Sequence, residues 1–563
     1  MQIMKCFFRL AAFLLPMFSF SQSTYIPFGN KAYDFIDRME IKLQDNKDLN
    51  FSSIKPYSRK SVVREIEYMD STGISGNSDI NLSKVDQYNL NSLLMNNSEW
   101  VKTSRPEFES ANPVLQKFYI NKANLLEVNT KDFFLALNPV IHFQAGKESN
   151  NTGTMLLNTR GISVRGLIAN KIGFYSIITD NQERGPKFFE NRVNMFRAEP
   201  GAGFYKPFRN HAFDYFDARG YITFNATKYI DVQFGYDKNF IGNGYRSLFL
   251  SDYANSYLFL KLNTRIWKFN YENIFMELMP QFSKNGKDSL LNRKYAVMHH
   301  LSMNITKWLN VGLFESVIFG RVNHFDFEYL NPIIFLRSIE GTVGSPDKAH
   351  VGLDFKANLA HKAQLYGQFL LDEFVAKQIT KSNGYWANKY ALQLGAKYID
   401  ALGINNLDLQ LEYNMARPFT YSHNDTTSNY THYNQPLAHP LGANFKEIIA
   451  IAKYQPIPKL FLSGRIIYYI QGLDSAGVNF GGNPFESYLT RKKDFGYYIG
   501  SGNKAKCLNT SFTASYEVKE NLFIDANFLY RKYTTALASS LKNNTNMFTI
   551  GVRWNMVKRE YDY

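Results

Sequence analysis

The chain has 563 residues, a formal net charge of +15 and an aromatic content of 16%. A chain so rich in aromatic residues can bury a large apolar area, which argues against wholesale disorder. Its two cysteines, Cys6 and Cys507, exclude a disulfide framework, a zinc knuckle and a redox CxxC motif. Lysine and arginine are dispersed rather than gathered in runs, so the positive charge does not indicate nucleic acid as a partner.

The first 21 residues have the pattern of a secretory signal peptide. Lys5 and Arg9 supply a positive start, and residues 10–20 form an apolar run that is too short to span a bilayer as a helix. Small residues then suit cleavage after Ser21. We therefore expect an exported protein, and an exported chain without disulfides fits a bacterial envelope better than a eukaryotic secretory route.

Residues 22–97 have helical periodicity. Asn30, Ser58 and Ser83 are suited to cap three short helices, and Ser83 with Asp86 resembles a capping box. Apolar residues follow each cap at helical spacing, and each helix is too short to bury its apolar stripe alone. The sequence therefore predicts a small periplasmic three-helix bundle over residues 22–97.

Beyond Pro113 the hydrophobic period changes from helical to two. Residues 230–237, 407–414 and 548–555 each alternate an apolar or aromatic residue with a polar residue or glycine. This is the pattern of a strand in a sheet with one wet face. Such segments recur to the C-terminus without a long helix between them, which predicts an antiparallel, closed β-structure over residues 98–563.

The predicted connections alternate between short and long. Short turns fall at residues 129–132, 170–171, 227–228 and 306–307, and long loops rich in glycine, asparagine and tyrosine fall at 181–215, 237–253, 321–350, 418–445 and 473–506. Short turns on one side and long loops on the other are typical of an outer-membrane barrel. The mean hydropathy of −0.31 is compatible with this fold, because lipid-facing and lumen-facing residues alternate. The alternative is a large secreted β-sandwich or propeller, although no blade-length repeat supports the propeller.

The number of strands is less well defined by the sequence. A direct count gives an odd number, whereas single-chain bacterial barrels have even numbers. Either a weak strand lies near residues 99–107, or one strand has been divided in two. We expect about 16 to 20 strands.

Four segments resemble the Wzi-like capsule-assembly family. They are residues 27–39 (PFGNKAYDFIDRM), 235–252 (GYDKNFIGNGYRSLFLSD), 328–335 (EYLNPIIF, followed by GSPD at 344–347) and 412–423 (EYNMARPFTYSH). The last is similar to a form of the family found in Bacteroidetes and linked to gliding motility. The resemblance implies an 18-stranded outer-membrane barrel with a helical bundle at its periplasmic mouth, and a role in binding surface polysaccharide. The C-terminus departs from the usual barrel ending, because residues 557–563 follow the last strand.

No motif for catalysis or metal binding stands out. The chain contains no Gly-x-Ser-x-Gly elbow, no His-Glu-x-x-His and no P-loop, so we expect no enzyme and no cofactor. His299 and His300 are adjacent on a predicted strand and point to opposite faces. His423, His432 and His439 share one loop, but no acidic residue or cysteine has metal-site spacing, so we expect no metal.

Five charged loop residues are the candidates for ligand binding: Arg246, Asp252, Arg337, Glu340 and Asp347. Arginine can bind a carboxylate or phosphate with two hydrogen bonds, and carboxylates can accept hydrogen bonds from sugar hydroxyls. Long loops of barrels often fold inward, so these residues either bind a ligand or form a salt-bridge network that fixes a loop in the lumen.

Loop tyrosines have a similar pair of interpretations. They either offer flat faces to sugar rings or pack within the loops. The residues concerned are Tyr421, Tyr430, Tyr433, Tyr488, Tyr497 and Tyr498.

The leading hypothesis is a non-enzymatic outer-membrane barrel that binds or organises surface polysaccharide. The basic surplus favours an acidic glycan or the phosphates of lipopolysaccharide. The family resemblance further implies that the protein supports gliding motility or surface adhesion. Its partners would then include proteins of a motility apparatus. The alternatives are a porin-like channel, which requires an open lumen, and a membrane-embedded hydrolase.

Overall fold

The computed structural model describes residues 23–44, 49–74, 82–102, 105–149, 151–282, 290–321, 324–379, 381–475, 477–535 and 543–563. The predicted signal peptide, residues 1–21, lies outside these described residues. No helix within them is long and apolar enough to cross a membrane.

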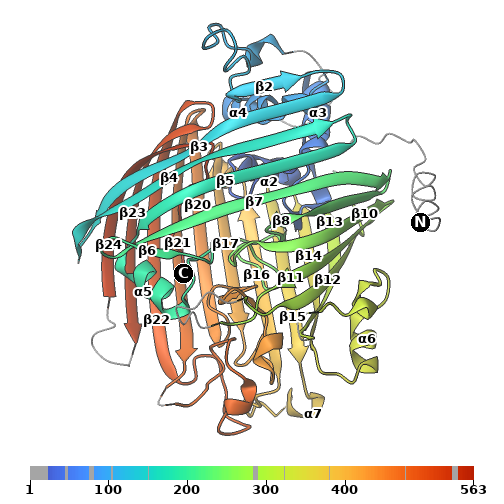
Figure 1. Cartoon of the computed structure of the whole chain (residues 1–563), viewed down its shortest axis with the longest axis vertical. Helices are drawn as coiled ribbons and strands as arrows, with labels where there is room; N and C mark the ends of the chain where they lie inside the picture. The colour runs from blue at the N-terminus through green and yellow to red at the C-terminus, as the bar shows by residue number, and fades with distance from the viewer. Residues whose placement is uncertain are drawn as a thin grey trace, which may run out of the picture.

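Eighteen antiparallel strands close into a barrel, in which the last strand pairs with the first (Figure 1). This confirms the predicted fold class and the even strand number. The strands are β3 (Phe133–Glu148), β4 (Asn151–Ile168), β5 (Ile172–Arg184), β7 (Ala212–Thr227), β8 (Ile230–Asp237), β10 (Tyr257–Ile266), β11 (Phe269–Leu278), β12 (Lys294–Asn304), β13 (Leu309–Phe319), β14 (Lys348–Leu359), β15 (Ala363–Glu373), β16 (Lys389–Tyr398), β17 (Leu407–Ala416), β20 (Phe445–Ile457), β21 (Leu460–Leu473), β22 (Asn503–Lys519), β23 (Leu522–Thr535) and β24 (Asn543–Trp554). Two short strands, β2 (Leu126–Asn129) and β6 (Lys206–Phe208), pair with β3 and β7.

The weak strand suggested near residues 99–107 is wrong. That region holds two 3-10 turns, η2 (Ser98–Trp100) and η3 (Pro106–Phe108), the second of which begins with a proline. Proline has no backbone N–H to donate to a neighbouring strand, so it is disfavoured in a sheet, but it suits the first turn of a helix. Further 3-10 turns are η1 (Leu49–Phe51), η5 (Ala401–Gly403) and η7 (Tyr488–Thr490).

The register assigns each strand position to the lumen or to the outer wall. Asn310 of β13 lies opposite Lys356 of β14, whose ammonium contacts Glu40 inside the barrel. Alternate residues therefore face outward, and among them Leu313 and Leu353 form a directly opposed pair, 57% and 46% exposed. The predicted period of two thus separates a polar inner face from an apolar outer wall.

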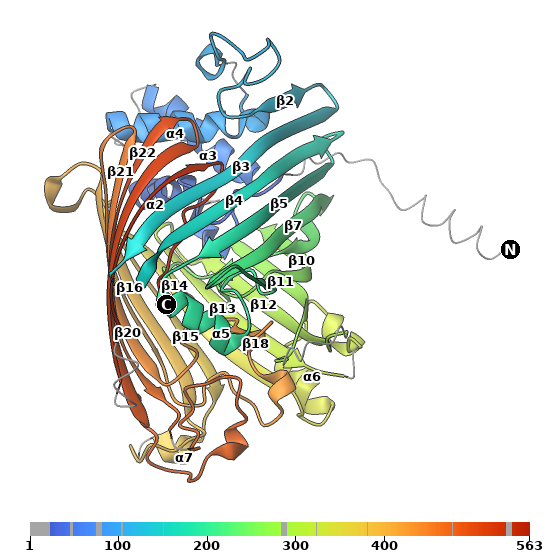
Figure 2. The ribbon, with the colours of Figure 1, turned by 60° about the vertical axis from the view of Figure 1, so that its left-hand side comes forward.

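The N-terminal helices are α2 (Ala32–Leu43), α3 (Arg59–Ile74) and α4 (Lys84–Met95), and they lie at the end of the barrel where the turns are short (Figures 1 and 2). The predicted capping box is confirmed, because Ser83 and Asp86 satisfy each other's backbone N–H groups. The helical segment also enters the lumen. Strand β1 (Ile54–Lys55) pairs there with β9 (Phe240–Ile241), from the loop before β10.

The long loops fill the lumen from the other end. Residues 418–445, which carry η6 (Thr426–Ser428), β18 (Thr431–His432) and β19 (Gln435–Pro436), are almost entirely buried. They share an apolar core with the inner wall and the loop before β10. Helix α5 (Lys187–Phe196) packs beside β23 and β24, and α7 (Ala376–Ile379) lies among the loops (Figure 2).

One long loop lies outside the barrel instead of in the lumen. Residues 324–347, which we name the outer strap, carry η4 (Phe327–Leu330) and α6 (Leu336–Thr342). Tyr329, Leu336 and Ile339 pack against Val317 and Phe319, which are outward positions of β13. The loop lies outside the barrel wall (Figure 1), so the expectation that it folds into the lumen is wrong. Its apolar side chains pack against the apolar outer wall.

Candidate functional site

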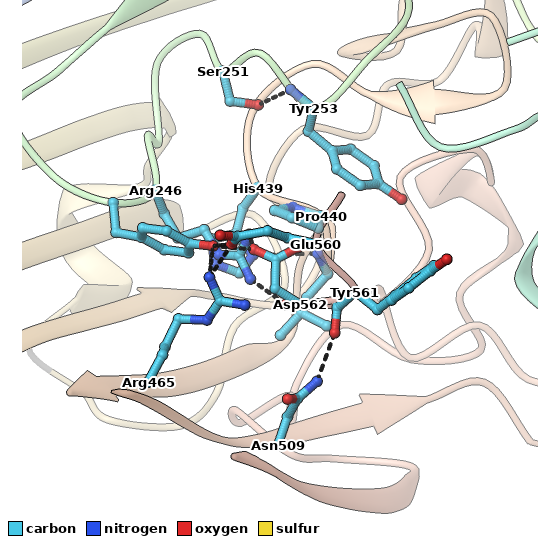
Figure 3. A network of polar contacts seen from close by, with 12 residues as sticks. Arg246, Ser251, Tyr253, His439, Pro440, Arg465, Asn509, Glu560, Tyr561 and Asp562 are labelled. Carbon is cyan, nitrogen blue, oxygen red and sulfur yellow. Dashed lines mark hydrogen bonds and ion pairs between the residues drawn. The ribbon is translucent and has the colours of Figure 1, made fainter. Parts of the chain in front are cut away.

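The C-terminal tail, residues 555–563, turns back into the lumen and joins its two sides (Figure 3). Arg246, in the loop before β10, donates from Nη1 to Oδ2 of Asp562 over 2.8 Å, and the Tyr245 hydroxyl donates to the same oxygen over 2.6 Å. Arg465 of β21 pairs with Glu560. These contacts fix the tail to strands and loops far from it in sequence.

The end of the tail docks on the opposite wall. Arg559 pairs with both Glu183 and Glu199, and the Tyr561 hydroxyl donates to Oε1 of Glu183 over 2.7 Å. Tyr563 packs edge-on against Phe188 of α5, with ring centroids 6.2 Å apart. The tail is therefore an internal plug.

The tail carboxylates have pKa values that depend on their arginine partners. Burial alone would raise the pKa of Asp562, but Arg246 and Arg465 outweigh burial and hold this pKa below its usual range. The pKa of Glu560 is likewise lowered, by Arg465 and Lys558 against the effect of burial. A carboxyl with a lowered native pKa stabilises the docked state above its unfolded pKa of about 4, and this contribution is lost as pH falls below that value.

We expect the tail to be fully protected at pH 6–8 and to loosen near pH 3. Hydrogen exchange read by mass spectrometry, corrected for intrinsic rates, should show about a tenfold fall in protection of residues 557–563 at the lower pH. In the Asp562→Asn variant the pH dependence should shrink, because one titrating carboxylate is gone. Equal protection at both pH values in the unaltered chain would contradict the ion-pair account.

A cavity of about 640 Å³ lies between the N-terminal helices, the inner faces of β3–β5 and β21–β24, and the tail. Its walls are rich in amides, hydroxyls and arginines. Several lining polar atoms, among them His142 Nε2 and Asp525 Oδ1, are buried without a hydrogen-bond partner among the described residues. The cavity could accommodate water or small polar groups.

The structure divides the five predicted site residues into two groups. Arg246 and Asp252 line the lumenal cavity, where Arg246 is 7% exposed and committed to the tail. Arg337, Glu340 and Asp347 lie on the outer strap, outside the barrel. There Arg337 pairs with Glu340 over 2.5 Å, and Asp347 pairs with Arg321 over 2.6 Å. Arg246, Arg337, Glu340 and Asp347 thus form ion pairs, in two separate places. Asp252 instead accepts from the Lys238 ammonium through its backbone carbonyl, over 3.0 Å.

The loop histidines are held apart by separate partners. His439 contacts Glu447 over 2.7 Å, His432 contacts the Ser256 carbonyl over 3.1 Å, and His423 accepts from the Asp425 N–H over 3.3 Å. Within the described ranges no group of histidine, cysteine and acidic residues has the arrangement of a metal site.

Most of the candidate tyrosines are packing residues. Tyr421, Tyr430, Tyr433 and Tyr497 are buried in the loops that fill the lumen. Tyr488 is partly exposed and lies 4.8 Å from the Trp386 ring. Tyr498 is 51% exposed, so it alone of the six offers a largely open ring.

A serine, a histidine and an aspartate meet across β13–β15. Ser316 Oγ lies 3.2 Å from His350 Nδ1, and His350 Nε2 lies 3.7 Å from Asp372 Oδ2. Ser316 and His350 are 0% and 2% exposed, and the ring of Tyr430 lies 4.7 Å from that of His350. A substrate cannot reach this serine in the structure, so the arrangement does not favour the hydrolase.

An exposed basic and aromatic segment lies on the loop side, and of its residues only Tyr497 and Tyr498 were singled out from the sequence. Lys492, Lys493, Phe495 and Tyr498 are all exposed. The Arg491 guanidinium stacks 3.8 Å from the Trp386 centroid and anchors the segment. We name residues 491–498 the loop-side platform. Its signal in the sequence is the run RKKDFGYY, in which three cations are followed closely by three aromatic residues.

The structure is a closed barrel whose lumen holds helices, loops and the C-terminal tail, and whose loop side carries an exposed basic and aromatic platform. The family model described as capsule assembly protein Wzi matches residues 213–469, which run from β7 into β21. This central part of the chain is thus similar to the Wzi capsule assembly family.

Comparison of structures gives the same fold. Wzi of Escherichia coli, described as an outer membrane protein involved in group 1 capsule assembly and a carbohydrate-binding β-barrel, aligns with 12% identity and a TM-score of 0.57. The alignment covers 96% of this chain and all of Wzi. OprD of Pseudomonas aeruginosa aligns with 11% identity and a TM-score of 0.41, over 75% of this chain and 94% of its own. No curated protein matches the sequence.

Proposed function

We propose that this chain is a non-enzymatic outer-membrane barrel that binds acidic surface polysaccharide at its loop side, in a capsule-assembly role. The observation that carries the proposal is the filled lumen. The N-terminal helices and the tail enter it from the end with the short turns, and residues 418–445 and α5 enter from the other end. A filled barrel is a poor channel but a rigid base for loops that bind a ligand.

The loop-side platform has the chemistry for an acidic glycan. Its lysines attract carboxylates or phosphates, and Phe495 and Tyr498 offer rings to the apolar faces of sugars. Stacking of Trp386 between Arg491 and Tyr488 holds the platform in place, so little ordering is required on binding. The fold and the family model, whose relatives include a carbohydrate-binding barrel, support this proposal.

A role in gliding motility or adhesion is the finer part of the proposal. It is supported by the resemblance of residues 412–423 to the gliding-linked form of the family. Lipopolysaccharide and motility proteins are the partners it implies. Deletion of the gene should reduce cell spreading and alter the surface glycan, and unchanged spreading and glycan would contradict it.

Binding of the purified, detergent-solubilised chain to the host's surface polysaccharide over a salt series tests the proposal. We expect saturable binding that weakens with salt, because charge attraction is screened. Replacing Lys492 and Lys493 together by alanine should weaken binding about tenfold and flatten the salt dependence, since each lost charge contact is worth about 0.7 kcal/mol.

The matched control replaces Lys131 and Lys171, which are exposed on short turns at the opposite end of the barrel. This variant should bind as the unaltered chain does. Binding that is absent at low salt, or equally weakened by both pairs of substitutions, would contradict a loop-side site. Steady conductance of the intact chain in a planar bilayer would favour the channel instead.

A further inference from the structure

The outer strap covers only the loop-side end of the outer wall. It packs on Tyr295 and Val297 of β12 and on Val317 and Phe319 of β13, whereas Leu313, nearer the middle of the wall, stays bare. Strands β12 and β13 have 11 residues each, about the length a tilted strand needs to cross the hydrocarbon of a membrane. At the opposite turn, Trp308 is 44% exposed, as an interfacial aromatic would be. The strap therefore lies near the other interface.

A polar latch holds the strap on the wall. Glu315 is an outward residue of β13, and its Oε1 lies 2.8 Å from Nδ1 of His299 on β12. Its Oε2 accepts from the backbone N–H of Leu336 in the strap over 2.9 Å. Without the strap this carboxylate would face the surroundings of the barrel wall. A carboxylate in hydrocarbon is costly, so the latch indicates a strap that is permanently seated.

The far side of the strap is apolar. Phe327, Ile333 and Phe335 are 79%, 86% and 54% exposed, and Leu330 and Ile334 extend this face. Several charges of the strap are paired, Arg337 with Glu340 inside the strap and Asp347 with Arg321 just before it. Contiguous exposed apolar side chains mark a surface that is covered in the working state of a protein.

We propose that lipid covers this face, and that the outer strap is seated in the outer leaflet where head groups meet acyl chains. This inference rests on the outer-membrane placement proposed above. The face adjoins the bare apolar wall at Leu313 and Leu353, so both meet the same surroundings. Short helices η4 and α6 satisfy much of the strap backbone, and Asn331 Oδ1 accepts from the Ile333 N–H, which suits the interface rather than the bilayer centre.

Site-specific fluorescence in vesicles tests the proposal. Cys507 is buried, and the mature chain has no other cysteine, so a Cys507→Ala background accepts single cysteines. We would label Ile333→Cys with an environment-sensitive dye in vesicles of phosphatidylethanolamine and phosphatidylglycerol. Quenchers would be a shallow doxyl lipid, a deep doxyl lipid and aqueous iodide. Heat-modifiable migration on gels would establish that each variant is folded.

Two matched controls provide reference quenching patterns for a label in lipid and a label in water. Leu313→Cys reports the bare wall, and Leu489→Cys, at a site 63% exposed on the loop side, reports water. We expect the label at residue 333 to be quenched most by the shallow lipid, the label at 313 most by the deep lipid, and the label at 489 by iodide alone. Phe335→Cys should repeat the result of Ile333→Cys.

Two outcomes would overturn the inference. A label at 333 that behaves like the label at 489 would place the strap in water. A label at 333 that is shielded from all three quenchers would show that protein, such as a second copy, covers this face. If the label at 313 also escapes lipid quenching, the outer-membrane placement itself fails, which distinguishes the two failures.

Discussion

Replacing Arg246 by methionine is expected to lower the free energy of unfolding by about 3–5 kcal/mol, because it removes one partner from a buried charge cluster. The guanidinium contacts Asp562 over 2.8 Å and lies 3.7 Å from Oε1 of Glu447. The Glu447 side chain is 1% exposed and that of Asp562 only 15%, so neither carboxylate regains full hydration while the tail stays docked. The fall in the free energy of unfolding would mainly reflect the cost of leaving the two carboxylates without a cationic partner. It would not equal the net contribution of the ion pair to stability.

Reversible urea unfolding in detergent, followed by tryptophan fluorescence, would measure this change. The double variant Arg246→Met with Asp562→Leu should recover most of the loss, because it removes both charges. Lys187→Met is the control for an exposed pair. Its ammonium is 48% exposed beside Glu190, so we expect a change of about 0–1 kcal/mol. Equal effects of Arg246→Met and Lys187→Met would contradict the plug as a stabilising element.

Replacing Glu40 by glutamine should loosen the helical segment from the barrel, by a similar amount of about 3–5 kcal/mol. Glu40 Oε1 lies 2.5 Å from Lys356 Nζ, both side chains are 1% exposed, and Ser52 Oγ hydrogen-bonds to both groups. The amide would leave the lysine charge unneutralised in the lumen. Limited proteolysis of residues 23–97 in the folded barrel should become at least about tenfold faster in the variant.

The control for Glu40 is Asp34, which pairs with Lys453 over 2.6 Å at the same mouth but is 56% exposed. Asp34→Asn should change the proteolysis rate by less than about fivefold, because exposed pairs contribute about 0–1 kcal/mol. Faster release in Asp34→Asn than in Glu40→Gln would show that the rim, not the buried pair, holds the helices.

The barrel could be predicted from the sequence because its signal is repeated along the chain. Each strand such as β17 or β24 has a period of two, which follows directly from the pleat. The capping box at Ser83 could be predicted for a similar reason, since its bonds are local. The number of strands was harder to predict from the sequence. Residues 99–107 have no clear periodicity, so their sequence does not distinguish 3-10 turns from a weak strand.

The position of the loops could not be predicted from periodicity. An apolar loop such as residues 324–347 can pack on the inner or the outer face of a barrel, and only three-dimensional contacts decide between them. Pairing of Arg246 with Asp562 joins positions 316 residues apart, a separation at which spacing carries no information. The loop-side platform is visible in the sequence as a basic run beside aromatic residues. This is a common surface pattern, so it does not by itself indicate a binding site.

The inward course of the C-terminal tail has a practical consequence for work with this protein. Tyr563 is 6% exposed, and the Arg192 guanidinium lies 4.7 Å from its ring centroid. An affinity tag or reporter fused after this residue would have to start inside the barrel, where it would either stay hidden from its resin or antibody or expel the tail. Tags are better inserted at an exposed short turn away from the loop-side platform, such as the one at Lys171, which leaves the chain end in place.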